Sequence, residues 1–309
     1  MQLSRAVKKL NLTTIFGVVL LSSISTLAHA NTFSQLAISA GNESNVPRGL
    51  GGAHEKESDF MALEYTLGKL FEVGVKNTFV LSAAVDASRF YDLRGFDSVG
   101  LSVAANYNYK WALGAYAPVV SVSTSYAVEE YVGRARDNDL LTVDVSYMKR
   151  LSPAWFLTLG ADYQNSGADS LAFDPVIDSY GWNQSIRPPF ELYDYDSTSV
   201  YADLEYGFEN GMLLNAGYRR VDGFTVSSTT TPKLALYKVA GGLYSDPAFK
   251  KGWVAYQLEA DTNEWSLGLS IPSGRDSSIN VGYSFYDISA INANTYINRI
   301  FSVSYMHNF

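Results

Sequence analysis

The stretch that decides the fold is Phe301-Ser302-Val303-Ser304-Tyr305-Met306-His307-Asn308-Phe309. Apolar side chains fall on every second position, at Phe301, Val303, Tyr305 and Phe309. Alternation with a period of two predicts a β-strand that has one face in an apolar medium. The opposite face carries serine and asparagine side chains, so it must meet water.

The same alternation recurs along most of the chain. It is clearest at 97–110, where valine, leucine, alanine and tyrosine alternate with serine and asparagine. Further alternating segments lie at 33–41, 61–67, 79–86, 116–131, 141–147, 154–164, 197–208, 212–219, 265–271 and 279–285. Turn signals such as Glu209-Asn210-Gly211 and longer polar connections separate them. The sequence therefore predicts an all-β chain of many strands.

The first thirty residues have the form of a secretory signal peptide. Arg5, Lys8 and Lys9 precede an apolar core at 15–27, and residues 28–30 read Ala-His-Ala. A basic region, a short apolar core and an A-x-A site together predict cleavage, with the mature chain beginning near Asn31. A membrane anchor helix is the alternative, and the shortness of the core disfavours it. No later apolar run approaches the roughly 18 residues that a membrane helix needs.

An alternating strand that ends on an aromatic residue, behind a secretory signal, resembles the C-terminal signature of bacterial outer-membrane β-barrels. The resemblance spans residues 33–309 and matches no characterised porin subfamily, so no functional residues carry over. It implies a transmembrane antiparallel up-and-down barrel in the Gram-negative outer membrane, with lipid and lipopolysaccharide around it. It also implies that Tyr305 and Phe309 are an assembly signal for the barrel-assembly machinery. The alternative fold is a soluble periplasmic β-sandwich or lipocalin-like barrel.

The number of strands depends on residues 227–271. Val254, Tyr256, Leu258 and Ala260 occupy even positions, whereas the apolar residues of 265–269 occupy odd ones. If both sets face outward, a bulge or a hairpin must lie near residues 261–263. One long strand at 253–271 after a loop at 227–252 gives twelve strands, which we favour. A hairpin gives fourteen.

Composition and charge exclude several functions. The 309 residues include no cysteine, which removes thiol catalysis and cysteine-ligated metals. Lysine and arginine number 23 and aspartate and glutamate 31, and the first thirty residues hold three of the basic ones. The mature charge is then 20 − 31, or −11, which argues against nucleic acid as a partner. No motif for a cofactor or a metal is present.

Catalysis is not expected. The mature chain has two histidines, His54 in a charged loop and His307 close to the end of the last strand. Neither lies in a G-x-S-x-G or H-E-x-x-H motif. An outer-membrane hydrolase is the weakest of the functions considered.

The strand phases place carboxylates on the water-facing side of the predicted barrel. The candidates for lining the lumen are Glu64, Asp86, Asp144, Asp162, Asp203 and Glu205, with Arg219 as the basic exception. Rings of carboxylates favour cations, so the sequence predicts a porin-like channel for passive diffusion of small polar solutes, with a bias toward cations. Two alternatives stay open: the carboxylates only hydrate the wall, or the barrel is narrow or plugged and has a structural or surface-interaction role.

The connection at about 166–196 is unusually long and apolar. It contains Leu171, Phe173, Trp182 and Phe190. Long loops are commonly functional or disordered, and this much apolar surface disfavours disorder. We expect an extracellular loop that folds onto the mouth of the barrel.

Overall fold

The computed structural model describes residues 32–133, 136–168, 192–230, 239–240, 243–246, 248–249, 252–291 and 294–309. Strands dominate these residues. They are β1 (Thr32–Glu43), β2 (Ser58–Glu72), β3 (Asn77–Phe90), β4 (Ser98–Lys110), β5 (Val119–Tyr131), β6 (Asn138–Arg150), β7 (Trp155–Ala168), β8 (Tyr195–Gly207), β9 (Leu213–Thr229), β10 (Leu243–Ser245), β11 (Val254–Pro272), β12 (Ser277–Ala290) and β13 (Asn294–Asn308). Two 3₁₀ turns, η1 (Gly52–His54) and η2 (Arg94–Phe96), complete the described elements. Among the described residues, no helix is long and apolar enough to cross a membrane.

The sheet closes on itself. Each long strand pairs antiparallel with the next one along the chain, β9 pairs with β11, and β13 returns to pair with β1. The three-residue β10 only extends the edge of β11 beyond the barrel wall. Twelve strands therefore form a closed antiparallel up-and-down barrel, which confirms the favoured count. Closure leaves no open sheet edge, as a strand that spans hydrocarbon requires.

The prediction of a bulge or a hairpin near residues 261–263 is wrong, because the two sets of apolar residues do not both face outward. β11 is one continuous strand, and its register against β9 runs without a break from Val254↔Thr229 to Ser270↔Leu213. The even-numbered apolar residues point to the inside, where Tyr256 and Leu258 are fully buried, whereas the odd-numbered Leu267 is 54% exposed on the outside. The two sets occupy opposite faces at different heights of one strand, so no change of phase is needed.

The outer surface is apolar. Val103, Leu159 and Val200 are among the many large apolar side chains that stay exposed. Aromatic residues gather toward the ends of the strands, for example Trp155, whose ring lies 4.8 Å from that of Tyr206. An apolar band with aromatic residues at its borders is typical of strands that face lipid. This surface needs hydrocarbon around it and fixes the barrel as a membrane-spanning one.

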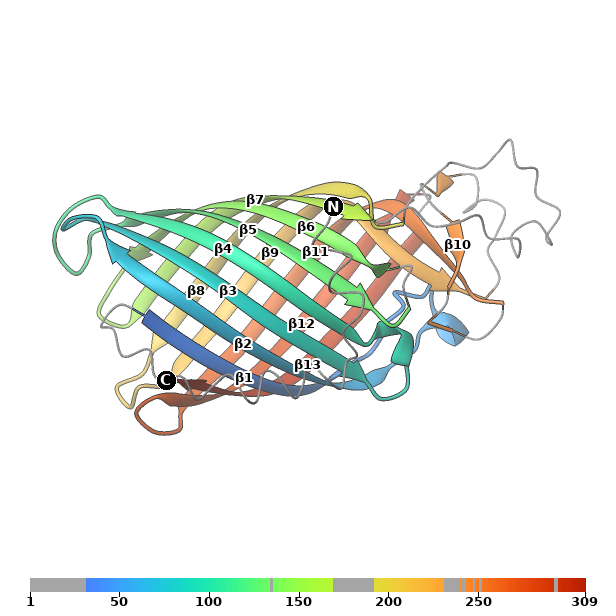
Figure 1. Ribbon diagram of the computed structural model, residues 1–309, viewed down its shortest axis with the longest axis horizontal. Coiled ribbons are helices and arrows are strands. Elements are labelled where there is room, and N and C mark those ends of the chain that lie inside the picture. Colours follow the sequence, from blue (N-terminus) through green and yellow to red (C-terminus); the bar gives the residue numbers. More distant parts are fainter. Residues whose placement is uncertain are drawn as a thin grey trace.

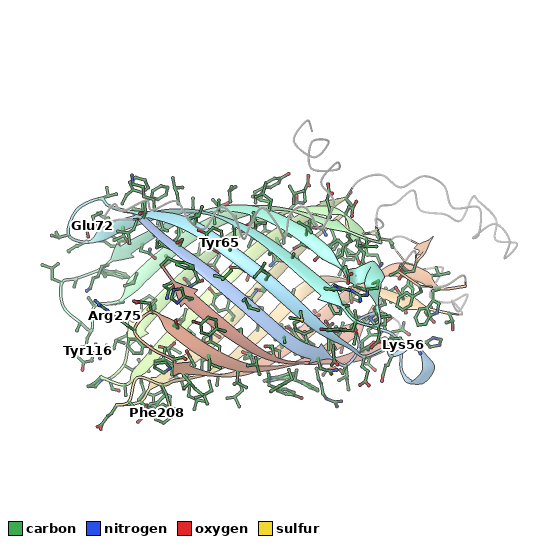
Figure 2. All side chains as sticks on the ribbon, turned by 60° about the horizontal axis from the view of Figure 1, so that its bottom comes forward. Lys56, Tyr65, Glu72, Tyr116, Phe208 and Arg275 are labelled. Atoms are coloured by element: carbon green, nitrogen blue, oxygen red, sulfur yellow. The ribbon has the colours of Figure 1, made fainter. Side chains whose placement is uncertain are left out.

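The two ends of the barrel differ in the length of their connections. Short turns at 73–76, 111–118, 151–154, 208–212 and 273–276 share one end. Figure 1 shows these turns and the C-terminus at the left, and β10 with the longer connections at the right. Figure 2 labels Glu72, Tyr116, Phe208 and Arg275 at the short-turn end and Lys56 at the other. In outer-membrane barrels the short turns are periplasmic and the long loops extracellular.

A cluster of buried apolar residues covers one side of the inner wall at the extracellular end. It comprises Ala240, Tyr256, Leu258, Ala260, Ile288, Ala290 and Tyr296, with Leu50, Val239 and Tyr286 against it. The hydroxyl groups of Tyr256 and Tyr296 lie 3.1 Å apart. Leu50 and Ala240 belong to connections outside the strands, so chain from two extracellular segments folds inward onto this wall.

Candidate functional site

One row of inward residues crosses four neighbouring strands. Glu64 lies directly opposite Asp86, Asp86 opposite Gly100, and Gly100 opposite Glu129. Directly opposed residues on antiparallel strands share a face of the sheet. Three carboxylates therefore line one arc of the inner wall, in one row across the strands. Glu129 was not among the expected lumen residues, although its odd position in the serine-rich strand 116–131 placed it on the water-facing side.

A second group combines acidic and basic side chains across β6 to β9. Asp144 lies opposite Asp162, and the guanidinium of Arg219 lies 3.0 Å from the Asp162 carboxylate. The hydroxyl of Tyr201 donates to Asp144 at 2.8 Å, and Arg219 lies over the Tyr201 ring at 4.9 Å. Ser199 also donates to Asp162. Arg219 thus neutralises one carboxylate of the wall rather than standing alone in the lumen.

The remaining two expected residues lie closer to the short turns. Asp203 faces Gly217 on β9, and Glu205 faces Asn215 two residues further along. Glu205 and Asn215 line a cavity of about 350 Å³ whose other walls come from β11, β12 and β13. This cavity lies in the periplasmic half of the barrel, and five of its eleven lining residues are serine or asparagine.

Glycines on the inner wall make room for these carboxylates. A Cβ atom at Gly100 would collide with the carboxylate of Asp86, and one at Gly217 would collide with that of Asp203. The carboxylates therefore lie flat across the neighbouring strand instead of pointing to the axis. Sequence periodicity cannot reveal this arrangement, because it depends on which residue stands opposite on the next strand.

The extracellular mouth is held by a buried ion pair, Arg136 with Asp246, called here the mouth ion pair. Its two hydrogen bonds, from Nη1 to Oδ1 and from Nη2 to Oδ2, measure 2.8 and 2.6 Å. Both residues are nearly fully buried, at 3% and 2% exposure. Ser228 at the end of β9 also donates to Asp246. The pair therefore joins the β5–β6 connection to the segment that precedes β11.

Aromatic stacking continues from the mouth ion pair. The Arg136 guanidinium lies 4.0 Å from the centre of the Phe96 ring. Phe96 meets Phe249 edge-on at 5.8 Å, and Phe249 stacks on Trp253 at 4.0 Å. Three extracellular connections converge in this stack, which holds Asp246, Phe249 and Trp253 against the inside of the mouth.

The acid–base properties of the mouth follow from this geometry. Burial alone would raise the pKa of Asp246, but the hydrogen bonds and charge of Arg136, the Ser228 hydroxyl and the Ala248 N–H bring it below its usual value. An aspartate that carries these contacts stays ionised at every pH at which the protein would normally work. The mouth ion pair is thus charged on both sides.

The two histidines lie at opposite ends of the barrel. Nδ1 of His54 is 3.2 Å from the Thr229 hydroxyl, and its ring meets Trp253 edge-on at 6.3 Å. Nδ1 of His307 is 2.8 Å from the Ser277 hydroxyl, and the Phe309 ring lies edge-on at 4.5 Å. In these contacts neither histidine ring pairs with a carboxylate that would support general-base chemistry. Within the described residues, no group of three histidine, aspartate or glutamate side chains could hold a metal ion.

Two expectations concern parts of the chain that the structure describes only in part. The signal peptide and residues 169–191 lie outside the described residues. Leu192 is buried against Val226 and Ala255, and Gln257 Nε2 donates to the backbone carbonyl of Leu192 at 3.0 Å. At its β8 end the connection therefore does pack onto the mouth.

The proposed assembly signal, Tyr305 and Phe309, lies on the outward face at the periplasmic end, and its role stays a prediction.

Comparison with known proteins supports the fold. No family model and no curated protein matches the sequence. An outer membrane channel from Pseudomonas putida F1 is similar in structure, with a TM-score of 0.54, 10% identity, and 90% of this chain and 96% of that chain covered. The outer membrane channel DcaP of Acinetobacter baumannii has a TM-score of 0.44 and 9% identity, over 90% of this chain and 96% of its own.

The closed strand order, the apolar outer surface and the polar inner wall agree with the likeness to the Pseudomonas putida F1 channel. The other similar structures include the KdgM porin in complex with disordered oligogalacturonate, at a TM-score of 0.44 and 10% identity over 89% of this chain and 99% of that one. This chain has the fold of an outer-membrane β-barrel, in a twelve-stranded form.

Proposed function

We propose that this barrel is a porin-like channel through which small polar solutes diffuse passively, with a preference for cations. The observation that carries the proposal is the excess of carboxylates on the inner wall. Glu64, Asp86 and Glu129 stand in one row, and Arg219 offsets only Asp162 in the next group.

Electrostatics gives the expected direction of selectivity. Clefts lined by one sign of charge concentrate counter-ions, and salt weakens the effect over a Debye length of about 10 Å at 0.1 M. Two unit charges that lie 4 Å apart in water interact with an energy of about 1 kcal/mol. Several uncompensated carboxylates in a narrow column of water therefore favour cations several-fold at low ionic strength.

A planar bilayer experiment tests this proposal. Reversal potentials across a salt gradient should show cation preference that declines as salt rises. The triple variant Asp144→Asn, Asp162→Asn and Asp203→Asn should lower the preference several-fold. Arg219→Gln alone should raise it, because the Asp162 charge is then no longer offset.

A matched control removes three carboxylates from the outer face. Asp222 and Asp261 lie opposite each other, and Glu259 lies opposite Phe224 on the same outward side. Neutralising these three should leave the reversal potential unchanged. A reversal potential that favours anions would refute the selectivity.

The second candidate function is a structural or surface-interaction role for a plugged barrel. The mouth ion pair and its aromatic stack favour it, because they hold Asp246, Phe249 and Trp253 inside the mouth. Absence of conductance, both in the native protein and after the mouth ion pair is broken, would decide for this alternative. Folding of every variant is checked by heat-modifiable migration on a detergent gel.

A further inference from the structure

A second cavity lies inside the extracellular mouth, beneath the segments that fold inward. Its volume is about 390 Å³, within the range of small-molecule sites in proteins. We call it the mouth cavity. Its charged lining residues are Glu43, Arg48, Glu129 and Arg136, and its aromatic ones are Phe90, Phe96, Tyr131, Tyr193 and Tyr195. Five amide or hydroxyl side chains and four apolar residues complete the lining.

The carboxylates of the mouth cavity are fixed but not saturated. Asn298 Nδ2 donates to Glu43 at 2.7 Å, and the Tyr131 hydroxyl donates to Glu129 at 2.6 Å. An ionised carboxylate has about four acceptor sites. Each glutamate therefore retains acceptor capacity that faces the cavity.

The turn that carries Arg48 is fixed by hydrogen bonds of its own. Arg48 is the one non-glycine residue of the described chain with a positive φ, at 50°. The turn that contains it is fastened by Asn45, whose side chain bonds the backbone of Gly49 as both donor (3.1 Å) and acceptor (2.8 Å). Strained backbone that its surroundings enforce is concentrated at functional sites. The turn sets the Arg48 side chain in the cavity wall at the cost of that strain.

Arg136 lines the cavity with its guanidinium group. Two of its nitrogens bind Asp246, and its Nε is buried beyond the reach of a solute.

We propose that the mouth cavity binds a small neutral saccharide, of one or two rings, on its way into the channel. A sugar presents hydroxyl groups that both donate and accept, which suits a wall with spare carboxylate acceptors and guanidinium donors. Its C–H faces suit the phenyl and phenol rings beside them. The inference rests on the proposed channel function for the solute's route, but not for the binding itself.

The balance of charge disfavours anionic solutes. Two carboxylates and two guanidinium groups line the cavity, but the charge of Arg136 is already offset by Asp246, so one negative charge is in excess and an anion gains little for its lost hydration. To bind a zwitterion, the cavity would need charged lining groups that have no partners of their own. Arg136 is already paired with Asp246, and Glu43 interacts electrostatically with Arg48.

Binding is measured by calorimetric titration of the folded full-length mature barrel in detergent. The ligands are maltose, the anionic disaccharide lactobionate and the zwitterion glycylglycine. Maltose should bind in the millimolar range, and each comparator at least tenfold more weakly. Arg48→Gly and Glu129→Gln should each weaken maltose binding about tenfold, the value of one charge-assisted hydrogen bond. Glycine suits the positive φ, so backbone strain cannot explain a loss at residue 48.

Matched controls remove the same charges from the periplasmic turns. Arg275→Gln and Glu209→Gln should leave maltose binding unchanged, since both residues are exposed at the opposite end. Preferential binding of any charged or zwitterionic comparator, or no binding of maltose by a folded barrel, would overturn the inference. Cation-selective conductance without maltose binding would sink this inference alone. Maltose binding without conductance would instead contradict the channel function.

Discussion

The middle of the barrel and its extracellular mouth use charge in opposite ways. In the middle, Glu64 and Asp86 stand side by side with no cation between them in the register. At the mouth, Asp246 is buried and meets Arg136 through two hydrogen bonds. The middle can leave carboxylates unpaired because water fills the lumen. The mouth ion pair is buried away from water, so its two charges must be paired.

The comparison teaches where stability and selectivity reside. Charges of the water-facing inner wall act on passing ions and contribute little to folding. The buried mouth ion pair fixes the inward-folded residues and acts on ions only by narrowing the entrance. Variants of the two regions should therefore give different phenotypes.

The largest effect is expected from breaking the mouth ion pair. Asp246→Asn leaves the buried Arg136 without its counter-charge, which costs about 3–5 kcal/mol. Asp246, Phe249 and Trp253 should become more mobile, and single-channel conductance should rise. Limited proteolysis and bilayer recordings measure the two consequences.

The outward ion pair between Arg220 and Asp261, at 3.3 Å with both side chains about half exposed, is the control for that experiment. Asp261→Asn should change stability by less than about 1 kcal/mol and leave conductance unaltered. Equal proteolysis of the two variants would contradict the assigned role of the mouth ion pair.

A smaller effect is expected from the apolar residues of β11. Leu258 is fully buried in the inner cluster, so Leu258→Ala should lower the free energy of unfolding by about 2–5 kcal/mol. Leu267 on the same strand is 54% exposed toward lipid, so Leu267→Ala should cost clearly less. Urea unfolding in lipid vesicles provides the comparison. A larger loss at Leu267 would show that the inward cluster does not hold the mouth.

The smallest effect concerns pH. A carboxyl whose folded pKa is depressed contributes stability above its unfolded value of about 3.9 and loses it as pH falls through the folded pKa. The pKa of Asp246 is lowered in this way, so the mouth should be unaffected between neutral pH and about pH 4. Below that, conductance should rise, and the rise should be absent in Asp246→Asn, which separates it from titration of the wall. A step that depends on Asp246 between pH 5 and 7 would contradict the depressed pKa.

The sequence by itself determined the strands, the two faces and the closed barrel. Alternation is local, and lipid outside leaves antiparallel strands no alternative to closing, so Leu101 and Val103 could be placed outward without a structure. The same parity placed Asp144 and Asp203 on strand faces that meet water. The same parity also indicates that Glu129 lies on the water-facing side.

The tertiary structure decided what stands opposite each residue and what folds inward. Residue parity told Tyr256 and Leu258 apart from Leu267 but could not say that the former point into an apolar cluster rather than into lipid. That depends on Leu50 and Ala240, which arrive from distant connections. The pairing of Arg136 with Asp246, 110 residues apart, and of Arg219 with Asp162 likewise comes from strand register and loop placement. Both are non-local, and no local pattern encodes them.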